Sequence, residues 1–142
     1  MVKKPLVFCI LVSSAVSVLG CECVPKSVKQ AKESSEIVFR GTITQMSAGK
    51  IVFRVTQIWK GDVGPTFDMP DVTEAAACLG FREKLLANGN DLLVFASRLH
   101  RYAGDNDYFT NVCLPTGLAS ETSETLRHLG KARPALGKRI AP

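Results

Sequence analysis

The spacing of the cysteines constrains this chain more than any other feature of its sequence. Five cysteines are present, and the four that follow residue 20 are Cys21, Cys23, Cys78 and Cys113. A bond between Cys21 and Cys23 would close a very small, strained ring. In an extended segment, however, residues two apart face the same side, so these two can reach separate partners. The sequence therefore allows Cys21–Cys78 with Cys23–Cys113, or the crossed set. Each bond would contribute at most about 4 kcal/mol, and the two contributions would not simply add.

The first twenty residues are typical of a secretory signal peptide. Lys3 and Lys4 form a short positive region, an apolar run follows as far as Leu19, and the small residue Gly20 ends the segment. The apolar run is about fifteen residues, shorter than the roughly twenty that span a bilayer, so we expect no membrane span. The sequence predicts that residues 1–20 are removed and that Cys21 becomes the N-terminus of a secreted or periplasmic protein.

Lipidation of Cys21 is the less favoured alternative. The sequence VLGC resembles a bacterial lipobox, which would make the chain a lipoprotein. The sulfur of Cys21 would then be used in a thioether, and three cysteines would remain for an oxidising compartment. Plain cleavage leaves an even number, as expected for a framework of two disulfides.

Length and charge indicate one exported domain with a basic tail. The chain has 142 residues, which after cleavage is enough for a single domain with a modest core. We expect the domain to span 21–130. Basic residues and prolines are frequent in 131–142, which we expect to be a solvated, disordered tail. Because the chain lacks a basic stripe rich in aromatic residues, no nucleic-acid partner is expected.

Alternating apolar and polar residues predict a mainly β fold. EIVFRGTITQM and IVFRVTQIWKG alternate on either side of the turn SAGK, which predicts a hairpin. We expect three further strands, a short one in PTFDMPDV, a strand buried on both sides in DLLVFAS, and another in DYFTNVC. Residues 74–90 are less clear, with REKLLANGN forming either a helical turn or a loop.

Two short helices are expected to flank these strands. Ser27 and Gln30 fit a capping box, so the first helix should run to about Glu33. The second should begin with Ser120 as its cap and end at Gly130. Together the elements predict a small five-stranded OB-like barrel with flanking short helices, and a β-sandwich fits the pattern nearly as well.

The sequence does not indicate an enzyme. It contains neither His-Glu-x-x-His nor Gly-x-Ser-x-Gly. Its two histidines are interpreted as a loop residue, His100, and a residue near a helix end, His128. With only these histidines, Cys-x-Cys would make a poor zinc ligand set, so we expect no intrinsic metal and no cofactor.

Taken in order, the motifs resemble the N-terminal domain of the tissue inhibitors of metalloproteinases and, more broadly, the netrin-like module. CECVP resembles the Cys-x-Cys opening of that family, and VTQIWKGD resembles a strand end with an aromatic-Lys-Gly sequence. ACLGF, NDLLVFA and NVC resemble its Cys-Gly segment, central strand and later cysteine. The resemblance covers about residues 21–130. A further family cysteine would fall near Glu33, where this chain has none.

The resemblance implies an OB-like barrel and a particular pairing, Cys21–Cys78 with Cys23–Cys113. It also implies a secreted inhibitor of zinc metalloproteinases. In the family, the free α-amino group and the carbonyl oxygen of the first cysteine, here Cys21, chelate the catalytic zinc of the protease.

Glu22 departs from the family pattern. The animal inhibitors usually have Thr or Ser at the matching position, and that side chain enters the specificity pocket beside the zinc. A buried, unpaired carboxylate is costly. Glu22 therefore indicates either a target with a basic or polar pocket, or a non-inhibitory netrin-like module that binds another protein partner.

Overall fold

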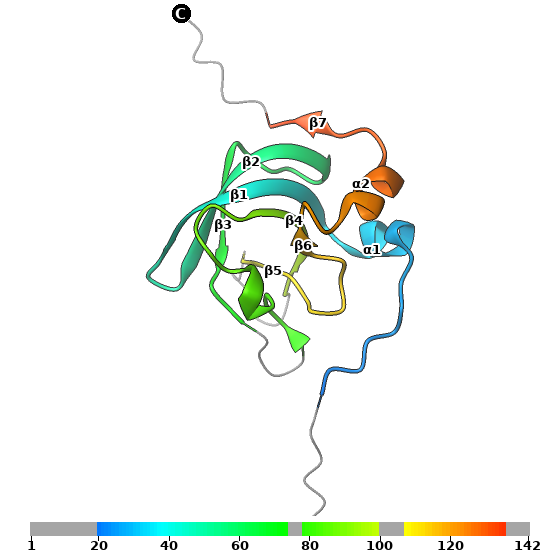
Figure 1. Ribbon diagram of the computed structural model, residues 1–142, viewed down its shortest axis with the longest axis horizontal. Coiled ribbons are helices and arrows are strands. Elements are labelled where there is room, and N and C mark those ends of the chain that lie inside the picture. Colours follow the sequence, from blue (N-terminus) through cyan, green and yellow to red (C-terminus); the bar gives the residue numbers. More distant parts are fainter. Residues whose placement is uncertain (1–19, 74–77, 100–106, 136–142) are drawn as a thin grey trace, which may run out of the picture.

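The computed structural model of the protein describes residues 20–73, 78–99 and 107–135 (Figure 1). The expected signal peptide lies outside these residues except for Gly20. The last seven residues of the expected tail, 136–142, also lie outside them.

The protein is mainly β, with a curled antiparallel sheet of five strands in the order β3-β2-β1-β4-β5 (Figure 1). Strands β6 and β7 add short pairings to β4 and β2. This half-barrel with two short helices beside it confirms the predicted fold class. In chain order the elements are α1 (Val28–Ser34), β1 (Ile37–Ser47), β2 (Lys50–Lys60), β3 (Thr66–Pro70), the 3₁₀ helix η2 (Glu83–Leu85), β4 (Asp91–Arg98), β5 (Tyr108–Phe109), β6 (Gly117–Leu118), α2 (Ser123–Leu129) and β7 (Arg133–Pro134).

Strands β1 and β2 form the predicted hairpin, and irregularities in its register accompany the curl of the sheet. The register shifts at three places along β1, and such bulges bend a strand and increase its twist. One shift lies between Arg40 and Gly41. A side chain at Gly41 would come within 3.0 Å of the carbonyl oxygen of Arg54, so the two strands pass closely there. The bent hairpin allows the sheet to wrap around its own apolar face.

Strand β4 is buried on both faces, as its continuous apolar sequence predicts. Its alternate residues belong to two different hydrophobic clusters. Leu92, Val94 and Ala96 belong to the larger cluster, which includes Phe39, Phe53 and Phe81. Leu93 and Phe95 belong to the smaller one, together with Ala31 of α1 and Leu129 of α2. The helices therefore cover one face of the sheet while the curled hairpin encloses the other.

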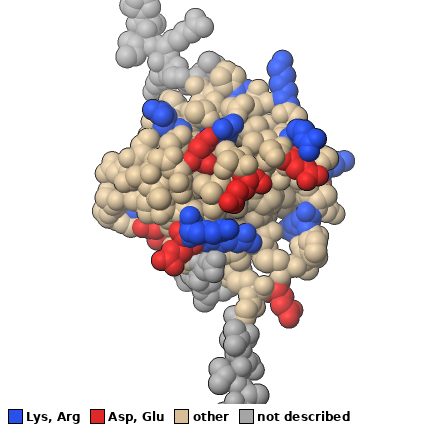
Figure 2. All heavy atoms as spheres, viewed as in Figure 1, with Lys and Arg blue, Asp and Glu red and all other residues tan. Residues whose placement is uncertain are grey.

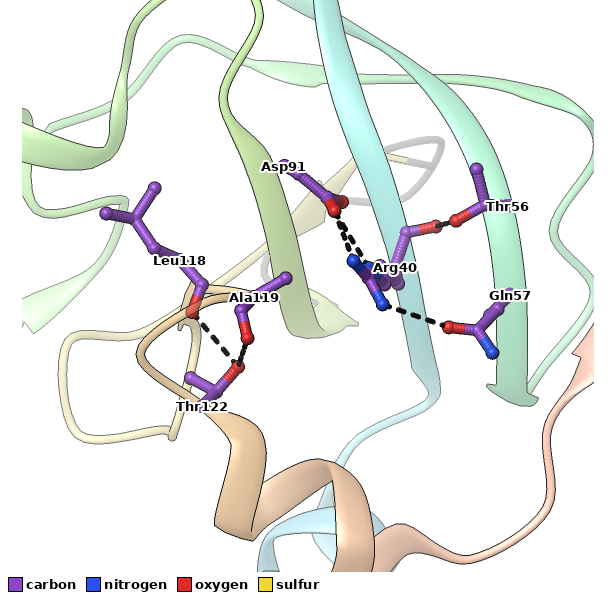
Figure 3. A network of polar contacts seen from close by, with 7 residues as sticks. All are labelled: Arg40, Thr56, Gln57, Asp91, Leu118, Ala119 and Thr122. Carbon is purple, nitrogen blue, oxygen red and sulfur yellow. Dashed lines mark hydrogen bonds and ion pairs between the residues drawn. The ribbon is translucent and has the colours of Figure 1, made fainter.

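A polar network links three strands on the surface of the sheet (Figure 3). Arg40 of β1 donates to Oδ2 of Asp91 from Nε, at 2.9 Å, and from Nη2, at 2.6 Å. Its Nη1 lies 3.5 Å from Oε1 of Gln57 on β2. The hydrogen bond that Arg40 donates to Asp91 raises the pKa of Arg40 above its usual value. Because both side chains of the ion pair are about one-third exposed, at 35% and 36%, we expect it to contribute no more than about 1 kcal/mol.

The first helix begins as predicted and the second does not. The N–H of Gln30 donates to Oγ of Ser27 at 3.2 Å, and the N–H of Ser27 donates to Oε1 of Gln30 at 2.9 Å. Helix α2 was expected to be capped by Ser120, but its N-cap is Thr122 and no side-chain cap is formed. The Thr122 hydroxyl instead donates to the carbonyl oxygens of the preceding turn, at Leu118 and Ala119 (Figure 3).

The prediction of a disordered tail from residue 131 is wrong for its first residues. Arg133 and Pro134 form β7, which pairs with Ile58 and Gln57 of β2. Strand β3 pairs only with the first part of β2, so the later part of β2 has backbone groups available for a further strand. Arg133 also donates from Nη2 to the carbonyl oxygen of Gly61. The ordered chain therefore continues past the expected boundary at residue 130.

Candidate functional site

Two disulfides attach the exposed N-terminal segment to the barrel. Cys21 is bonded to Cys78 and Cys23 to Cys113, with Cα–Cα distances of 5.6 and 5.1 Å. This is the pairing that the resemblance implies, whereas the residues alone also allowed the crossed set. We call residues 20–26 the N-terminal strap. Every residue of the strap is exposed, and Val24 has 77% of its surface accessible.

The strap has no polar contact with the barrel within the part of the chain that the structure describes. None of its backbone or side-chain atoms makes a hydrogen bond or an ion pair there. The capping interactions of α1 begin only at Ser27. The position of Cys21 therefore depends on its own disulfide, on the disulfide two residues later, and on the start of α1.

The strap is bonded to two chain segments that are themselves joined. We call residues 78–81 and 110–113 the platform. The N–H of Gly80 donates to the carbonyl oxygen of Thr110 at 3.0 Å, and the N–H of Val112 donates to that of Cys78 at 2.9 Å. The N–H of Cys113 donates to Oδ1 of Asn111 at 2.8 Å. Both disulfide partners therefore lie on one hydrogen-bonded unit.

The backbone of the platform has a conformation that few residues adopt easily. Cys78 has φ of +64° and Gly80 has φ of +99°. A side chain at Gly80 would bring Cβ to 2.2 Å from the carbonyl oxygen of Val72. Non-glycine residues with positive φ are uncommon and are often found at functional sites. This conformation directs the chain so that the buried side chain of Phe81 enters the core while Cys78 remains near the surface.

Two buried threonines connect the platform to β4. The hydroxyl oxygens of Thr110 and Thr116 lie 2.8 Å apart and share a hydrogen bond. Thr116 Oγ1 also accepts the N–H of Phe95 at 3.0 Å. The strand expected over 107–113 is therefore shorter than predicted, because beyond β5 a side-chain network and the platform replace regular pairing.

A groove of about 460 Å³ lies between the strap and the barrel. Glu22, Val24 and Lys26 of the strap line it, together with Leu79, Phe109 and Leu114 among other residues. Arg98 also lines the groove and donates from Nε to Oε2 of Glu36 at 2.7 Å. This hydrogen bond raises the pKa of Arg98 above its usual value, so the guanidinium remains charged. Figure 2 shows cationic and anionic side chains interspersed over the face it displays.

The two predicted contact residues, Cys21 and Glu22, are neighbours on the strap, and Glu22 lines the groove. Cys21 and Glu22 are both exposed, and Glu22 makes no ion pair or hydrogen bond with any described residue. His128 lies in the last turn of α2, as expected, whereas His100 lies outside the described residues. Sequence reasoning missed the threonine pair and the role of Gly80. The glycine two residues after Cys78 was a signal for a tight conformation, but the threonines carried no local signal.

The described ranges contain no group of three or more His, Cys, Asp and Glu residues that could hold a metal ion. None of the helices in these ranges has the length and apolar character needed to cross a membrane. Disulfides persist mainly in oxidising compartments, with which the two bonds of this chain are consistent.

A comparison with protein-family models gave no match, and neither did a comparison with curated proteins. Support for a function therefore comes from the geometry of the strap and the platform.

Proposed function

We propose that the chain is a secreted inhibitor of zinc metalloproteinases, which acts through the α-amino group and carbonyl oxygen of Cys21. The observation that supports this most strongly is the attachment of an exposed Cys21 to the platform through Cys78. Cleavage after Gly20 would make Cys21 the first residue. Its amine and carbonyl would then project from a fixed point on a rigid barrel.

The chemistry of a catalytic zinc site suits such a terminus. Catalytic zinc keeps one position open for water or substrate. The α-amino nitrogen and the carbonyl oxygen of one residue can displace that water and form a five-membered chelate ring. The amine must be unprotonated, and α-amino groups titrate near pH 8, so binding would release a proton. Inhibition should therefore weaken as the pH falls well below 8.

The disulfides contribute by ordering the chelating residue before it binds. A flexible terminus would lose backbone and side-chain freedom on binding, and that loss would reduce the affinity. Cys21 and Cys23 are both bonded to the platform, which is held to the core through Phe81 and the threonine pair. Much of the conformational entropy of the strap is therefore lost when the protein folds and not when it binds.

Glu22 supports a second candidate, a non-inhibitory netrin-like module that binds another protein. Its carboxylate is exposed and has no partner among the described residues. An inhibitor whose target has an apolar pocket would have to bury this charge at considerable cost. A binding module could leave it in solvent and use the groove beside the strap instead.

The decisive test is to add one alanine before Cys21. The change converts the α-amino group into an amide, which cannot serve as the same zinc ligand, and it places a residue where the zinc should lie. We expect the extended protein to fold with an unchanged Tm and to lose inhibition of every zinc protease that the native protein inhibits. Inhibition constants against a panel of zinc metalloproteinases provide the measurement.

Two other outcomes would contradict the proposal in different ways. Equal inhibition by the native and extended proteins would show that the contact surface lies elsewhere on the barrel. Absence of inhibition by the native protein, with its N-terminus at Cys21 verified by intact mass, would favour the binding module. A lipid-sized mass addition at Cys21 would also exclude chelation by a free terminus.

A further inference from the structure

We propose that the two disulfides form a redox latch, in which reduction releases the N-terminal strap while the barrel stays folded. The conformational part of this inference stands on the geometry alone. Its functional consequence, that reduction turns inhibition off, rests on the proposed function.

The strap has few attachments apart from its disulfides. Over the described residues it makes no hydrogen bond or ion pair, and its largest apolar side chain, Val24, is 77% exposed. Once Cys21 and Cys23 are reduced, the peptide bond to Ser27 is the remaining covalent connection between the strap and the folded protein. Helix α1, which begins there, keeps its capping box and its packing through Ala31. Ser27 therefore marks the boundary between released and retained structure.

The barrel does not use the cysteines in its core. Neither hydrophobic cluster contains a cysteine. The platform is held by backbone hydrogen bonds between residues 78–80 and 110–112, and these do not involve sulfur. The buried hydroxyl pair of Thr110 and Thr116 and the buried ring of Phe81 hold the same unit to the core. The contacts that define the barrel therefore remain after reduction.

The disulfides are accessible to a reductant. Cys21 and Cys23 are exposed, and Cys78 and Cys113 are partly exposed. A thiolate of a dithiol attacks one sulfur of a protein disulfide and forms a mixed disulfide while the other protein sulfur leaves as a thiolate. The second thiol of the reductant then closes a cyclic disulfide and releases the second protein sulfur. Each dithiol supplies two electrons and two protons, so two dithiols convert both protein disulfides into four thiols.

Release of the strap would weaken zinc chelation without removing either ligand atom. The amine and carbonyl of Cys21 remain after reduction, but they no longer have a fixed position. The strap must then be ordered during binding, and we expect the inhibition constant to rise by on the order of a hundredfold. Such a device would restrict inhibition to an oxidising environment.

Backbone order parameters from NMR relaxation test the latch directly on the exported protein. They are measured for Glu22, Cys23, Val24 and Lys26, since Pro25 has no amide N–H, before and after treatment with dithiothreitol. Hydrogen exchange is measured for β1, β2 and β4 in the same samples. We expect the order parameters of the strap to fall from about 0.85 to below about 0.6. The strand amides should stay protected, although the Tm should fall because two long loops lose their closure.

Serine variants separate the disulfides from the reducing agent. The double variant C21S/C78S keeps the N-terminal amine and carbonyl and retains Cys23–Cys113, so it should free the first residues of the strap. The quadruple variant, which adds C23S/C113S, should free the whole strap. The native protein with both disulfides intact is the matched control, and inhibition constants for all three report the functional consequence.

Each remaining outcome has a definite meaning. Strap order parameters that stay high after reduction would overturn the latch, since other contacts would then hold the strap. Loss of strand protection would also overturn it, because the disulfides would then maintain the barrel. If the strap is released and the barrel persists, but no form inhibits any protease, the latch stands and the proposed function fails. Release of the strap with unchanged inhibition would overturn the regulatory consequence.

Discussion

At the scale of single residues, Glu22 is the position where local structure and proposed function are in tension. Cys21 and Cys23 on either side of it form disulfides with the platform, so Glu22 is the side chain between them that can contact a partner. Glu22 lines the groove and is exposed to solvent. Any partner that contacts Cys21 would also meet this charge. The chemistry of Glu22 therefore restricts the partners that the strap can accept.

Replacing Glu22 with Thr tests this restriction. A carboxylate buried against an apolar pocket without a partner costs several kcal/mol, so E22T should improve inhibition of zinc proteases with apolar pockets by about tenfold to a thousandfold. It should weaken inhibition of proteases whose pocket contains Lys or Arg. Inhibition constants on both groups measure the effect, with K26T as a control for removing a strap charge outside the chelating end. No change with either group would show that residue 22 does not enter the pocket.

At the scale of elements, the point where the pairing between β4 and β6 ends decides where the chain leaves the sheet to form the platform. Strand β6 pairs with Leu92 and Leu93 only. If that register continued, Pro115 would face Phe95, and proline has no N–H to donate. The hydroxyl of Thr116 takes the place of strand pairing: it can donate to the carbonyl oxygen of Phe95, at 3.4 Å, and it accepts the N–H of Phe95 at 3.0 Å. It also lies 2.8 Å from the hydroxyl of Thr110. The same change from strand pairing to side-chain bonding allows the chain to leave the sheet and form the platform.

Substitution of Gly80 tests the platform as an element. In G80A the new Cβ would lie 2.2 Å from the carbonyl oxygen of Val72, so the backbone must shift. We expect a loss of about 2–4 kcal/mol in the free energy of unfolding, together with weaker inhibition. Gly89 is the matched control, because it also has positive φ but would have no atom within 4 Å of a new Cβ. G89A should cost only about 1 kcal/mol. Denaturant unfolding of both variants measures these losses. Equal losses in the free energy of unfolding would show that the close approach to Val72 is unimportant.

At the scale of the whole molecule, the first and last segments of the described structure are both attached to the barrel. The N-terminal strap is bonded to the platform at one side of the barrel, and β7 pairs with β2 at the other (Figure 1). Trp59 Nε1 donates to the carbonyl oxygen of Gly130 at 2.9 Å, and Ala135 packs against the larger cluster. The first residues after α2 therefore belong to the folded domain.

Truncation of the C-terminus measures the contribution of this segment. A chain ending at Gly130 loses β7, the hydrogen bond from Arg133 to Gly61, and the packing of Ala135. We expect the free energy of unfolding of this truncated chain to be about 1–2 kcal/mol lower than that of the native protein. A chain ending at Ala135 keeps all three and should match the native Tm. Thermal unfolding of the two truncated forms measures the difference. Equal Tm values would show that residues 131–135 do not stabilise the domain.

The sequence by itself determined the elements whose signals are local. Alternation predicted the β1–β2 hairpin, a continuous apolar run predicted the burial of β4 on both faces, and the Ser27–Gln30 spacing predicted the cap of α1. Each depends on residues within a few positions of one another, where the period of the backbone decides which side chains share a face. The same rule places Cys21 and Cys23 where they can reach two separate partners.

Only the tertiary structure decided how distant segments meet. The residues left the crossed cysteine pairing open, and the tail was expected to be disordered because its composition is basic and rich in proline. The positions of Cys78 and Cys113 on one platform, the bond between Thr110 and Thr116, and the strand at Arg133 all depend on contacts across long stretches of chain. Such contacts form because the curled sheet brings particular edges and loops together, and no short-range pattern in the sequence encodes which edge remains available.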